Sequence, residues 1–370
     1  MAYYNSLLYF CIIFFIFNFN TIITQGIGHV PAVIVFGDSL VDVGNNNHLE
    51  FSILKSNYAY NGVDYPNRKA TGRYSNGKNA ADFFAENLGL ATSPPYLSIK
   101  SASNKVKVLL DQGGINFASG GAGIFNETLN KLFKQSISLN EQISNFKTVH
   151  GELMQQLGTV EAQTYLAKSV FLIAIGSNDI LDKFQLVDSI LGKEPAGDHQ
   201  FINSLMVILK SKLKMIYNLG ARKFAVVGLG LIGCCPKLRS DNPKGECNER
   251  ANYWSVQYNK AVKSLLQELK EELPDIHYSL INTYDIMVDF LQQPAHYGFN
   301  EVKSACCGGG KFRAQVPCLA PIAVCCKNRR DHLFWDLYHP TEAAAKIIMN
   351  EFFMGTEKYV YPVNVMQLLE

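Results

Sequence analysis

The stretch AVIVFGDSLVDVGNNN, residues 32–47, joins a continuous apolar run to an abrupt polar break. Its first five residues, Ala32–Phe36, are all apolar, which is typical of a strand buried on both faces of a parallel sheet. This strand should end at Gly37–Ser39, where the chain can turn into a helix and leave backbone N–H groups free. Ser39 would then stand at the rim of the sheet, where a nucleophile and an anion-binding site coincide.

Outward from this stretch, strand-like and helix-like segments alternate along the chain. Further strands are predicted at Val106–Leu110, Ile115–Ala118, Ser169–Ile175, Phe224–Leu229 and His277–Ile281. Helices are predicted at Asn79–Leu88, over most of Glu127–Ala167, and at Asp198–Leu219, Ala251–Leu273 and Glu342–Phe353. Such alternation predicts a parallel sheet covered by helices. No internal repeat or low-complexity linker divides the pattern, so a single domain over residues 27–370 is expected.

Length and composition narrow the class of protein. The 370 residues can bury a large core. A formal net charge of +2, without a long basic run, argues against nucleic acid as a partner. Charged residues make up 18% of the chain and hydrophobic residues 48%, which argues against disorder.

The first 26 residues contain no Asp, Glu, Lys or Arg. The segment Leu7–Phe17 is almost entirely apolar but is short for a membrane span, which favours a secretory signal peptide. The absence of a Lys or Arg before it leaves an uncleaved anchor as the alternative. We therefore expect a signal peptide at residues 1–26 and a secreted, extracellular mature chain without a stable membrane span.

Cysteine usage agrees with secretion. Apart from Cys11, which lies in the expected signal peptide, there are eight cysteines: Cys234, Cys235, Cys247, Cys306, Cys307, Cys318, Cys325 and Cys326. An even number in loop-like sequence predicts disulfide bonds in an oxidising compartment, with few or no free thiols. Sequence neighbours such as Cys306 and Cys307 are not expected to bond each other. Cys235 with Cys247 is the most local bridge, and the other pairings stay open.

Two further features bear on metal binding and modification. No Cys-x-x-Cys occurs, and the histidine spacing does not match a zinc finger, so no metal site is predicted. Asn126-Glu127-Thr128 forms a glycosylation sequon, which a secreted chain could use.

Polar blocks follow two other predicted strands. Gly114–Gly123, GINFASGGAG, is rich in glycine, which permits a close approach of backbone to a ligand. Gly176–Asp179 follows the apolar run that ends at Ile175 and contains Asn178, whose amide remains a hydrogen-bond donor at every pH. Ligands of open α/β sheets bind beyond the carboxyl ends of the strands, so both blocks should lie near Ser39.

The last block is Asp336-x-x-His339, followed by Pro340-Thr341. Of the eight histidines, only His339 has an aspartate three positions before it. One turn can place the Asp336 carboxylate against Nδ1 of His339 and leave Nε2 free for Ser39.

In this order the blocks resemble those of the GDSL (SGNH) esterase/lipase family. Phe36–Leu40 looks like the family's first block, and Asp42–Asn46 is similar to its plant branch. Gly72–Gly77 also resembles that branch, with Tyr74 where phenylalanine is usual. The neighbouring Arg73 is expected to be structural or solvated. The resemblance implies a flavodoxin-like three-layer α/β/α sandwich with a mainly parallel sheet, the SGNH hydrolase fold.

The resemblance also implies a function, a secreted serine hydrolase of lipid or other acyl esters that needs no metal or cofactor. Ser39 would be the nucleophile, His339 the general base and Asp336 the residue that orients it. The N–H groups of Ser39 and Gly121, with Gly120 as the alternative, and the Asn178 amide would form the oxyanion hole. An acyltransferase with the same acyl-enzyme is the alternative function. A non-catalytic binding protein ranks last, because every catalytic position is present.

Overall fold

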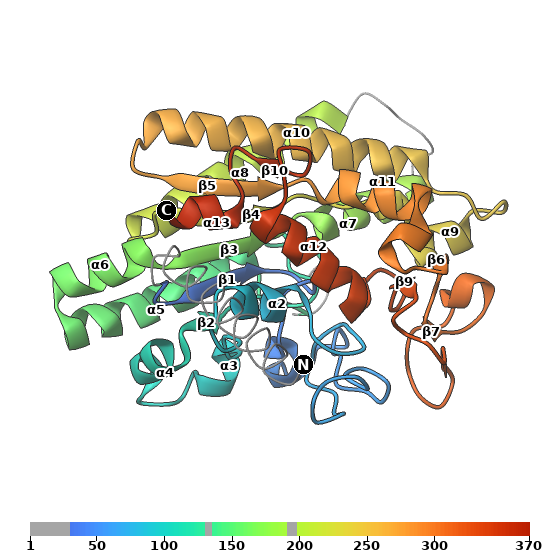
Figure 1. The fold of residues 1–370 in the computed structure, drawn as a ribbon, viewed down its shortest axis with the longest axis horizontal. Coiled ribbons are helices and arrows are strands. Elements are labelled where there is room, and N and C mark those ends of the chain that lie inside the picture. Colours follow the sequence, from blue (N-terminus) through green and yellow to red (C-terminus); the bar gives the residue numbers. More distant parts are fainter. Residues whose placement is uncertain (1–29, 130–134, 191–197) are drawn as a thin grey trace, which may run out of the picture.

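A computed structural model describes residues 30–129, 135–190 and 198–370 of the chain. The expected signal peptide, residues 1–26, lies outside the described residues, as does a short part of the predicted helical region 127–167. Figure 1 shows a central sheet with helices on both sides.

Within these described ranges, the central sheet has six strands in the order β10-β5-β4-β3-β1-β2. Five are parallel, and β10 runs antiparallel to β5. The strands are β1 (Val33–Gly37), β2 (Gly114–Asn116), β3 (Val170–Ala174), β4 (Lys223–Val227), β5 (His277–Ile281) and β10 (Val360–Tyr361). The parallel order β2-β1-β3-β4-β5 is that of flavodoxin-like sheets, so the predicted fold class is confirmed.

Alternate side chains of the strands point to opposite faces and define two helical layers. Phe36, Phe171 and Phe224 face one layer, whereas Val35, Leu172 and Ala225 face the other. The first layer contains α4 (Lys105–Gln112), α5 (Leu139–Leu157), α6 (Thr159–Lys168), α8 (Asp198–Asn218) and α10 (Glu249–Glu272). The second contains α2 (Ala80–Asn87), α11 (Thr283–Gln292), α12 (Glu342–Met354) and α13 (Val365–Leu369). The red helices α12 and α13 cross one side of the sheet in Figure 1.

The remaining elements of the described residues complete the fold. The other helices are α3 (Tyr96–Ile99), α7 (Ser177–Ile190) and α9 (Pro236–Asp241), with 3₁₀ turns at Asn45–His48, Ile232–Cys234, Pro294–Tyr297 and Lys311–Arg313. Two small sheets pair β6 (Glu301–Ala305) with β9 (His332–Phe334), and β7 (Cys307–Gly308) with β8 (Val324–Cys325). Along the chain, these four strands lie between α11 and α12. They support the block that contains Asp336 and His339.

One predicted strand, Val106–Leu110, is wrong, because this segment belongs to helix α4. Its β-branched valines favour a strand by propensity. The helix instead buries Val106 and Leu109, which lie three residues apart and therefore share one helical face. The Leu109 carbonyl also accepts a hydrogen bond from the Tyr165 hydroxyl at 3.2 Å. Tertiary packing decides this element against local propensity.

The predicted Cys235–Cys247 bridge is also wrong, since Cys234 forms the disulfide with Cys247. Their Cα atoms are 4.3 Å apart, while the side chain of Cys235 points away toward the Tyr338 carbonyl. The other bridges are Cys306–Cys326 and Cys307–Cys318. As expected, the sequence neighbours Cys306 and Cys307 bond to separate partners and not to each other. Cys235 and Cys325 are free thiols in the described part of the chain.

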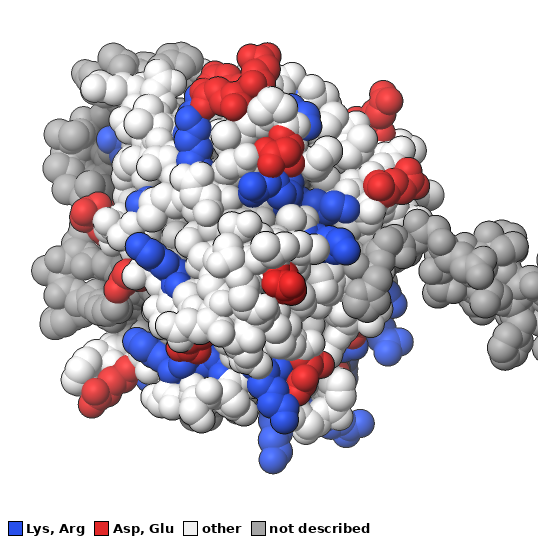
Figure 2. Space-filling view, turned by 90° about the vertical axis from the view of Figure 1, so that its left-hand side faces the viewer, with Lys and Arg blue, Asp and Glu red and all other residues white. Residues whose placement is uncertain are grey.

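The surface carries charges of both signs. On the face drawn in Figure 2, Lys and Arg side chains are interspersed with Asp and Glu among larger uncharged areas. This mixture fits the formal net charge of +2. Across the described ranges, none of the helices is both long and apolar enough to cross a membrane.

Candidate active site

Gly37 makes the sharp turn at the end of β1. Its φ is +151°, and a Cβ here would lie 2.2 Å from the Ala174 carbonyl oxygen of β3. The backbone is held by Gln142 of α5, whose Oε1 accepts from the Gly37 N–H at 2.9 Å and whose Nε2 donates to the Gly37 carbonyl at 2.8 Å. The Asp38 N–H donates to the Ala174 carbonyl at 2.9 Å. Ser39 is therefore fixed at the carboxyl edge of the sheet.

The structure brings Ser39, His339 and Asp336 into one line of hydrogen bonds. His339 Nε2 lies 2.8 Å from Ser39 Oγ, and Nδ1 lies 2.7 and 2.9 Å from the two carboxylate oxygens of Asp336. The side chains of Asp336 and His339 are each only 14% exposed. This is the relative arrangement that a nucleophile, a base and an orienting carboxylate require.

The charge state of Asp336 follows from its surroundings. Burial alone would raise its pKa, but the electrostatic interaction and the hydrogen bond with the His339 side chain oppose this, as do the N–H groups of Tyr338 and His339. Those two N–H groups donate to Oδ1 at 3.0 and 2.9 Å. The net effect holds the pKa of Asp336 below its usual range. Asp336 thus remains an ionised acceptor for the Nδ1–H of His339.

The turn that carries Asp336 and His339 is tied to buried structure on both sides. The Trp335 N–H donates to the His339 carbonyl at 2.8 Å, which closes the turn. Trp335 is fully buried, and its indole N–H donates to Asn61 Oδ1 at 2.8 Å. After the turn, Thr341 caps the start of α12. The predicted local turn is present, but its rigidity comes from distant partners such as Asn61.

Three groups near Ser39 could serve as oxyanion donors. In the described residues, the N–H groups of Ser39 and Gly121 donate no hydrogen bond within the protein. Gly120, by contrast, donates its N–H to Asp42 Oδ2 at 2.9 Å, which favours Gly121 over Gly120. Asn178 Nδ2 donates one hydrogen bond to the Ala122 carbonyl at 2.9 Å, which orients the amide. The second N–H of the same amide can then donate to a substrate oxygen.

A cavity of about 350 Å³ connects these groups. Ser39, Gly121, Asn178 and His339 all line it, and Asp336 lies behind His339. Most of the remaining wall is apolar, and it includes residues of the segment after β4 and of helices α11 and α12. Within the described ranges, no group of three or more His, Cys, Asp or Glu side chains is placed to hold a metal ion.

Comparison with known proteins places the chain in a family. A family profile described as GDSL-like lipase/acylhydrolase matches residues 33–352. The chain belongs to this GDSL family. It is 45% identical over 350 residues to a GDSL esterase/lipase of Arabidopsis thaliana, covering 94% of this chain and 92% of that protein. A second Arabidopsis GDSL esterase/lipase is 37% identical over 319 residues, with 86% and 87% covered.

A solved structure, the lipase Lip_vut3 from a goat rumen metagenome, covers 86% of this chain and 94% of its own. Its TM-score is 0.39 at 13% sequence identity. The family match and the two relatives confirm the predicted class, a carboxylic ester hydrolase.

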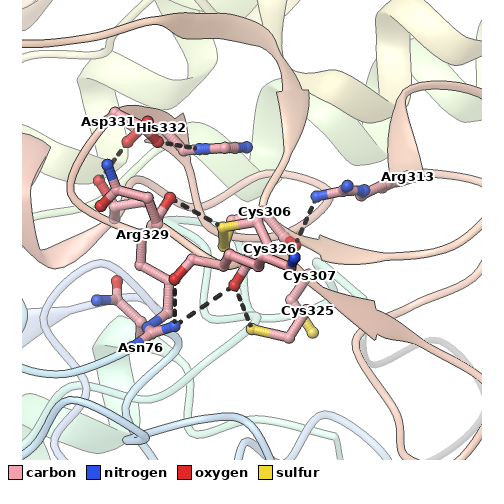
Figure 3. Close-up of a disulfide and its surroundings, with 12 residues drawn as sticks. Asn76, Cys306, Cys307, Arg313, Cys325, Cys326, Arg329, Asp331 and His332 are labelled. Carbon is pink, nitrogen blue, oxygen red and sulfur yellow. Dashed lines mark hydrogen bonds and ion pairs between the residues drawn. A yellow bond between two sulfur atoms is a disulfide. The ribbon is translucent and has the colours of Figure 1, made fainter.

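In this GDSL hydrolase, the disulfide-bonded segment supports the Asp336–His339 turn. The Cys307 N–H donates to the Trp335 carbonyl at 2.7 Å. Figure 3 shows the Cys306–Cys326 disulfide with Arg313 and Arg329 around it. Arg329 pairs with Asp64, with Nη2 at 2.8 Å from Oδ1, and so joins this segment to the loop before α2.

Asp42, which the sequence pattern indicates only as part of the family resemblance, supports the glycine-rich loop. Its Oδ1 accepts from the N–H groups of Gly44 and Asn45, both at 2.7 Å, and its Oδ2 accepts from the Gly120 N–H. Asp42 is fully buried, and burial raises its pKa to about 6 although these N–H groups lower it. Asp42 therefore fixes the backbone next to Gly121.

Asn46 makes the second set of contacts to the same loop. Its Nδ2 donates to the carbonyls of Gly120 at 2.8 Å and Leu54 at 2.6 Å, and its Oδ1 accepts from Ser119 Oγ. Asn46 and Gly120 are 74 positions apart. A sequence pattern shows that Asn46 is polar, but only the fold shows which backbone groups it holds.

Tyr74 covers His339. The two ring centroids are 4.9 Å apart with the planes inclined by 35°. The Tyr74 hydroxyl donates to the Leu54 carbonyl at 2.6 Å and accepts from Asn46 Nδ2 at 3.1 Å. Because Tyr74 has a hydroxyl that the usual phenylalanine lacks, it connects the loop around Leu54 to His339.

Two further buried carboxyl groups lie beside the site. Asp38 is 1% exposed, its Oδ1 accepts from the Leu40 N–H at 3.0 Å, and its Oδ2 has no partner in the described residues. Burial raises the pKa of Asp38 to about 7, although the Leu40 N–H and the electrostatic interaction with His339 lower it. Asp179 is held by the N–H groups of Ile124 and Phe125, and burial raises its pKa to about 6. The sequence predicted no role for Asp38 or Asp179.

Proposed function

We propose that this GDSL hydrolase cleaves carboxylic esters of lipid or other acyl type through an acyl-enzyme on Ser39. The observation that carries the proposal is the hydrogen bond of 2.8 Å between Ser39 Oγ and His339 Nε2, with Asp336 on the opposite side of the imidazole. Sequence similarity to two GDSL esterase/lipases over most of the chain supports the same chemistry.

In the first half-reaction, Ser39 Oγ attacks the ester carbonyl carbon while His339 Nε2 takes the hydroxyl proton. Asp336 accepts a hydrogen bond from Nδ1–H and stabilises the imidazolium that forms. As the tetrahedral intermediate collapses, His339 gives the proton to the leaving alcohol, and the acyl group remains on Ser39. In the second half-reaction, His339 deprotonates a water molecule that attacks the acyl-serine. The collapse returns the proton to Ser39 and releases the acid.

The oxyanion of both tetrahedral intermediates would be bound by the N–H groups of Ser39 and Gly121 and by the Asn178 amide. Support comes from their common place on the cavity wall and from the two backbone N–H groups that lack partners in the described residues. Such donors stabilise the transition state because they face the oxygen on which charge develops.

We further propose that the enzyme is secreted as a single domain of residues 27–370 after removal of residues 1–26. The apolar, uncharged first segment and the three disulfides support this location. Asn126 is exposed in the described structure, so its sequon would be accessible to glycosylation.

Covalent labelling tests the nucleophile. An organophosphonate ester should label Ser39 and abolish activity, and Ser39→Ala should be neither labelled nor active. Ser177→Ala is a matched control, because Ser177 lines the same cavity, and labelling should remain at Ser39. Labelling of another serine, with continued turnover by Ser39→Ala, would refute the assignment. Adding an acceptor alcohol and measuring the transferred acyl ester separates hydrolysis from acyl transfer.

A further inference from the structure

The cavity has two unequal sides. Toward α11 and α12, its wall consists of side chains no more than 8% exposed: Leu231, Met287, Leu333, Ala345, Ile348 and Met349. On the side of Asn178, the apolar lining residues Leu54, Leu129 and Leu181 are half-buried and reach the surface. Among the described residues, one side is therefore enclosed by the core, and the other is more open to solvent. We call the enclosed side the inner arm.

The chemistry assigns different substrate parts to the two sides. In the reaction proposed above, on which this inference rests, the acyl group stays bonded to Ser39 between the two half-reactions. The alcohol must leave and water must enter during the same interval. An enclosed apolar arm suits the part that stays, and an open side suits the parts that exchange.

We propose that the inner arm binds an unbranched aliphatic acyl chain, and that Ala345 and Met287 set the longest chain it accepts. Ala345, Ile348 and Met349 of α12 are three and four residues apart, so they form one face of the helix along the arm. The side chain of Ala345 is shorter than those of Ile348 and Met349, one turn further along the helix, and so fills less of the arm. A longer side chain at this position fills more of it.

Met287 of α11 also lines the arm, beside the segment after β4. A Cβ at Gly230 would lie 2.4 Å from Met287 Sδ, so the missing side chain at Gly230 makes room for the thioether. Methionine is unbranched and adapts to irregular space, which suits a wall that meets flexible chains. The arm also has a neutral thiol, because burial raises the pKa of Cys235 to about 12. Such a lining suits hydrocarbon.

Two ester series test this assignment. With p-nitrophenyl esters of linear acids, kcat/KM should rise about fourfold per added methylene until the arm is full and then fall. With alkyl acetates, in which the alcohol is varied, the dependence on chain length should be weak. A strong dependence in the alkyl acetates, with none in the acyl series, would place the alcohol in the arm and overturn the proposal.

Two variants change the arm in opposite directions. Ala345→Leu should move the optimum to shorter acyl chains and lower kcat/KM for the longest accepted ester by about tenfold or more, with little change for the acetate. Met287→Ala should move the optimum to longer chains. Ala343→Leu adds the same carbons to the same helix outside the cavity lining and should leave the profile unchanged. Equal losses for short and long esters in the first two variants would refute the proposal.

Binding without turnover separates this inference from the proposed mechanism. Calorimetry with a linear fatty acid should show binding to Ser39→Ala, and adding Ala345→Leu should weaken it about tenfold. If Ala345→Leu weakens fatty-acid binding as expected while the phosphonate labels a different serine, the proposed mechanism is refuted and the assignment of the inner arm is supported. If Ser39 is labelled but kinetics and binding ignore acyl length, the arm fails and the mechanism stands.

Discussion

The Asn178 side chain already uses one amide N–H on the Ala122 carbonyl, so only the second can face a substrate oxygen. That oxygen carries a full negative charge in the tetrahedral intermediate and a partial one in the bound ester. The donor should therefore stabilise the transition state more than the ground state. Asn178→Ala should lower kcat by about 10²–10³-fold with little change in KM, as measured by steady-state kinetics.

Asn178→Asp is the sharper companion variant, because it sets a carboxylate against the oxyanion and should be worse than alanine. Both variants should remain folded by circular dichroism and still react slowly with a phosphonate at Ser39. Near-native kcat in Asn178→Ala would make Asn178 a turn residue and leave the oxyanion to backbone N–H groups.

At the same scale, the sequence predicts local constellations better than distant ones. Asp336 and His339 are three residues apart, so one turn brings them together, and in the structure Asp336 contacts His339, which contacts Ser39. Gln142 holds the backbone of Gly37 across 105 positions, and no local pattern indicates that contact. The proposed catalytic residues could thus be predicted from sequence, whereas the side chains that hold their backbone could not.

At the scale of elements, an ion pair joins the loop before α2 to the helix itself. Arg73 and Asp82 are buried, with Nε–Oδ2 and Nη2–Oδ1 distances of 2.6 and 2.7 Å. Of the two expected roles of Arg73, structural or solvated, the structure shows the structural one. Removing one member leaves the other charge buried without its partner, which typically costs about 3–5 kcal/mol. Arg73→Leu should lower the free energy of unfolding by about that amount in urea denaturation.

A second pair between the same two elements provides the control. Lys78 and Glu86 also join this loop to α2, but the Glu86 side chain is 42% exposed. Glu86→Ala should therefore cost less than about 1 kcal/mol. Equal losses in Arg73→Leu and Glu86→Ala would show that burial does not govern these pairs.

Elements with strong patterns were predicted well. The strand at 277–281 agrees to the residue, and the strand predicted at 169–175 differs from β3 by one residue at each end. Both are runs in which nearly every position is buried, which leaves little ambiguity. α4 was missed because its valine-rich segment fits a strand and a helix equally well until Tyr165 and the neighbouring core are placed.

At the scale of the whole molecule, three disulfides leave two thiols in the described residues, Cys235 and Cys325. Secreted protein that has lost residues 1–26, denatured without reductant, should therefore show two free thiols in a colorimetric thiol assay. A chain that keeps Cys11 as a free thiol should show three. In the native protein, Cys325 should react first, because it is partly exposed and Cys235 is buried. Eight reactive thiols would contradict an oxidising compartment.

The pH dependence of stability should carry the signature of Asp38. Its pKa is about 7 in the folded protein against an ordinary value of 3.8, because burial disfavours the charged form and Asp179 and Asp42 add repulsion. Between these two values the native state binds a proton that the unfolded state has lost. The free energy of unfolding therefore falls as pH rises, by about 1.4 kcal/mol per unit for this group.

Asp38→Asn isolates that contribution, because asparagine has nearly the same shape and does not titrate. From pH 5 to pH 8, the free energy of unfolding of the unsubstituted enzyme should fall by about 2–3 kcal/mol more than that of Asp38→Asn. Urea unfolding at each pH measures both values. The other buried carboxyl groups, Asp42 and Asp179, are present in both proteins, so their effects largely cancel in the difference. Parallel pH profiles for the two proteins would mean that Asp38 is ionised throughout this range. Its Oδ2, which has no partner in the described residues, would then need a donor such as a bound water molecule.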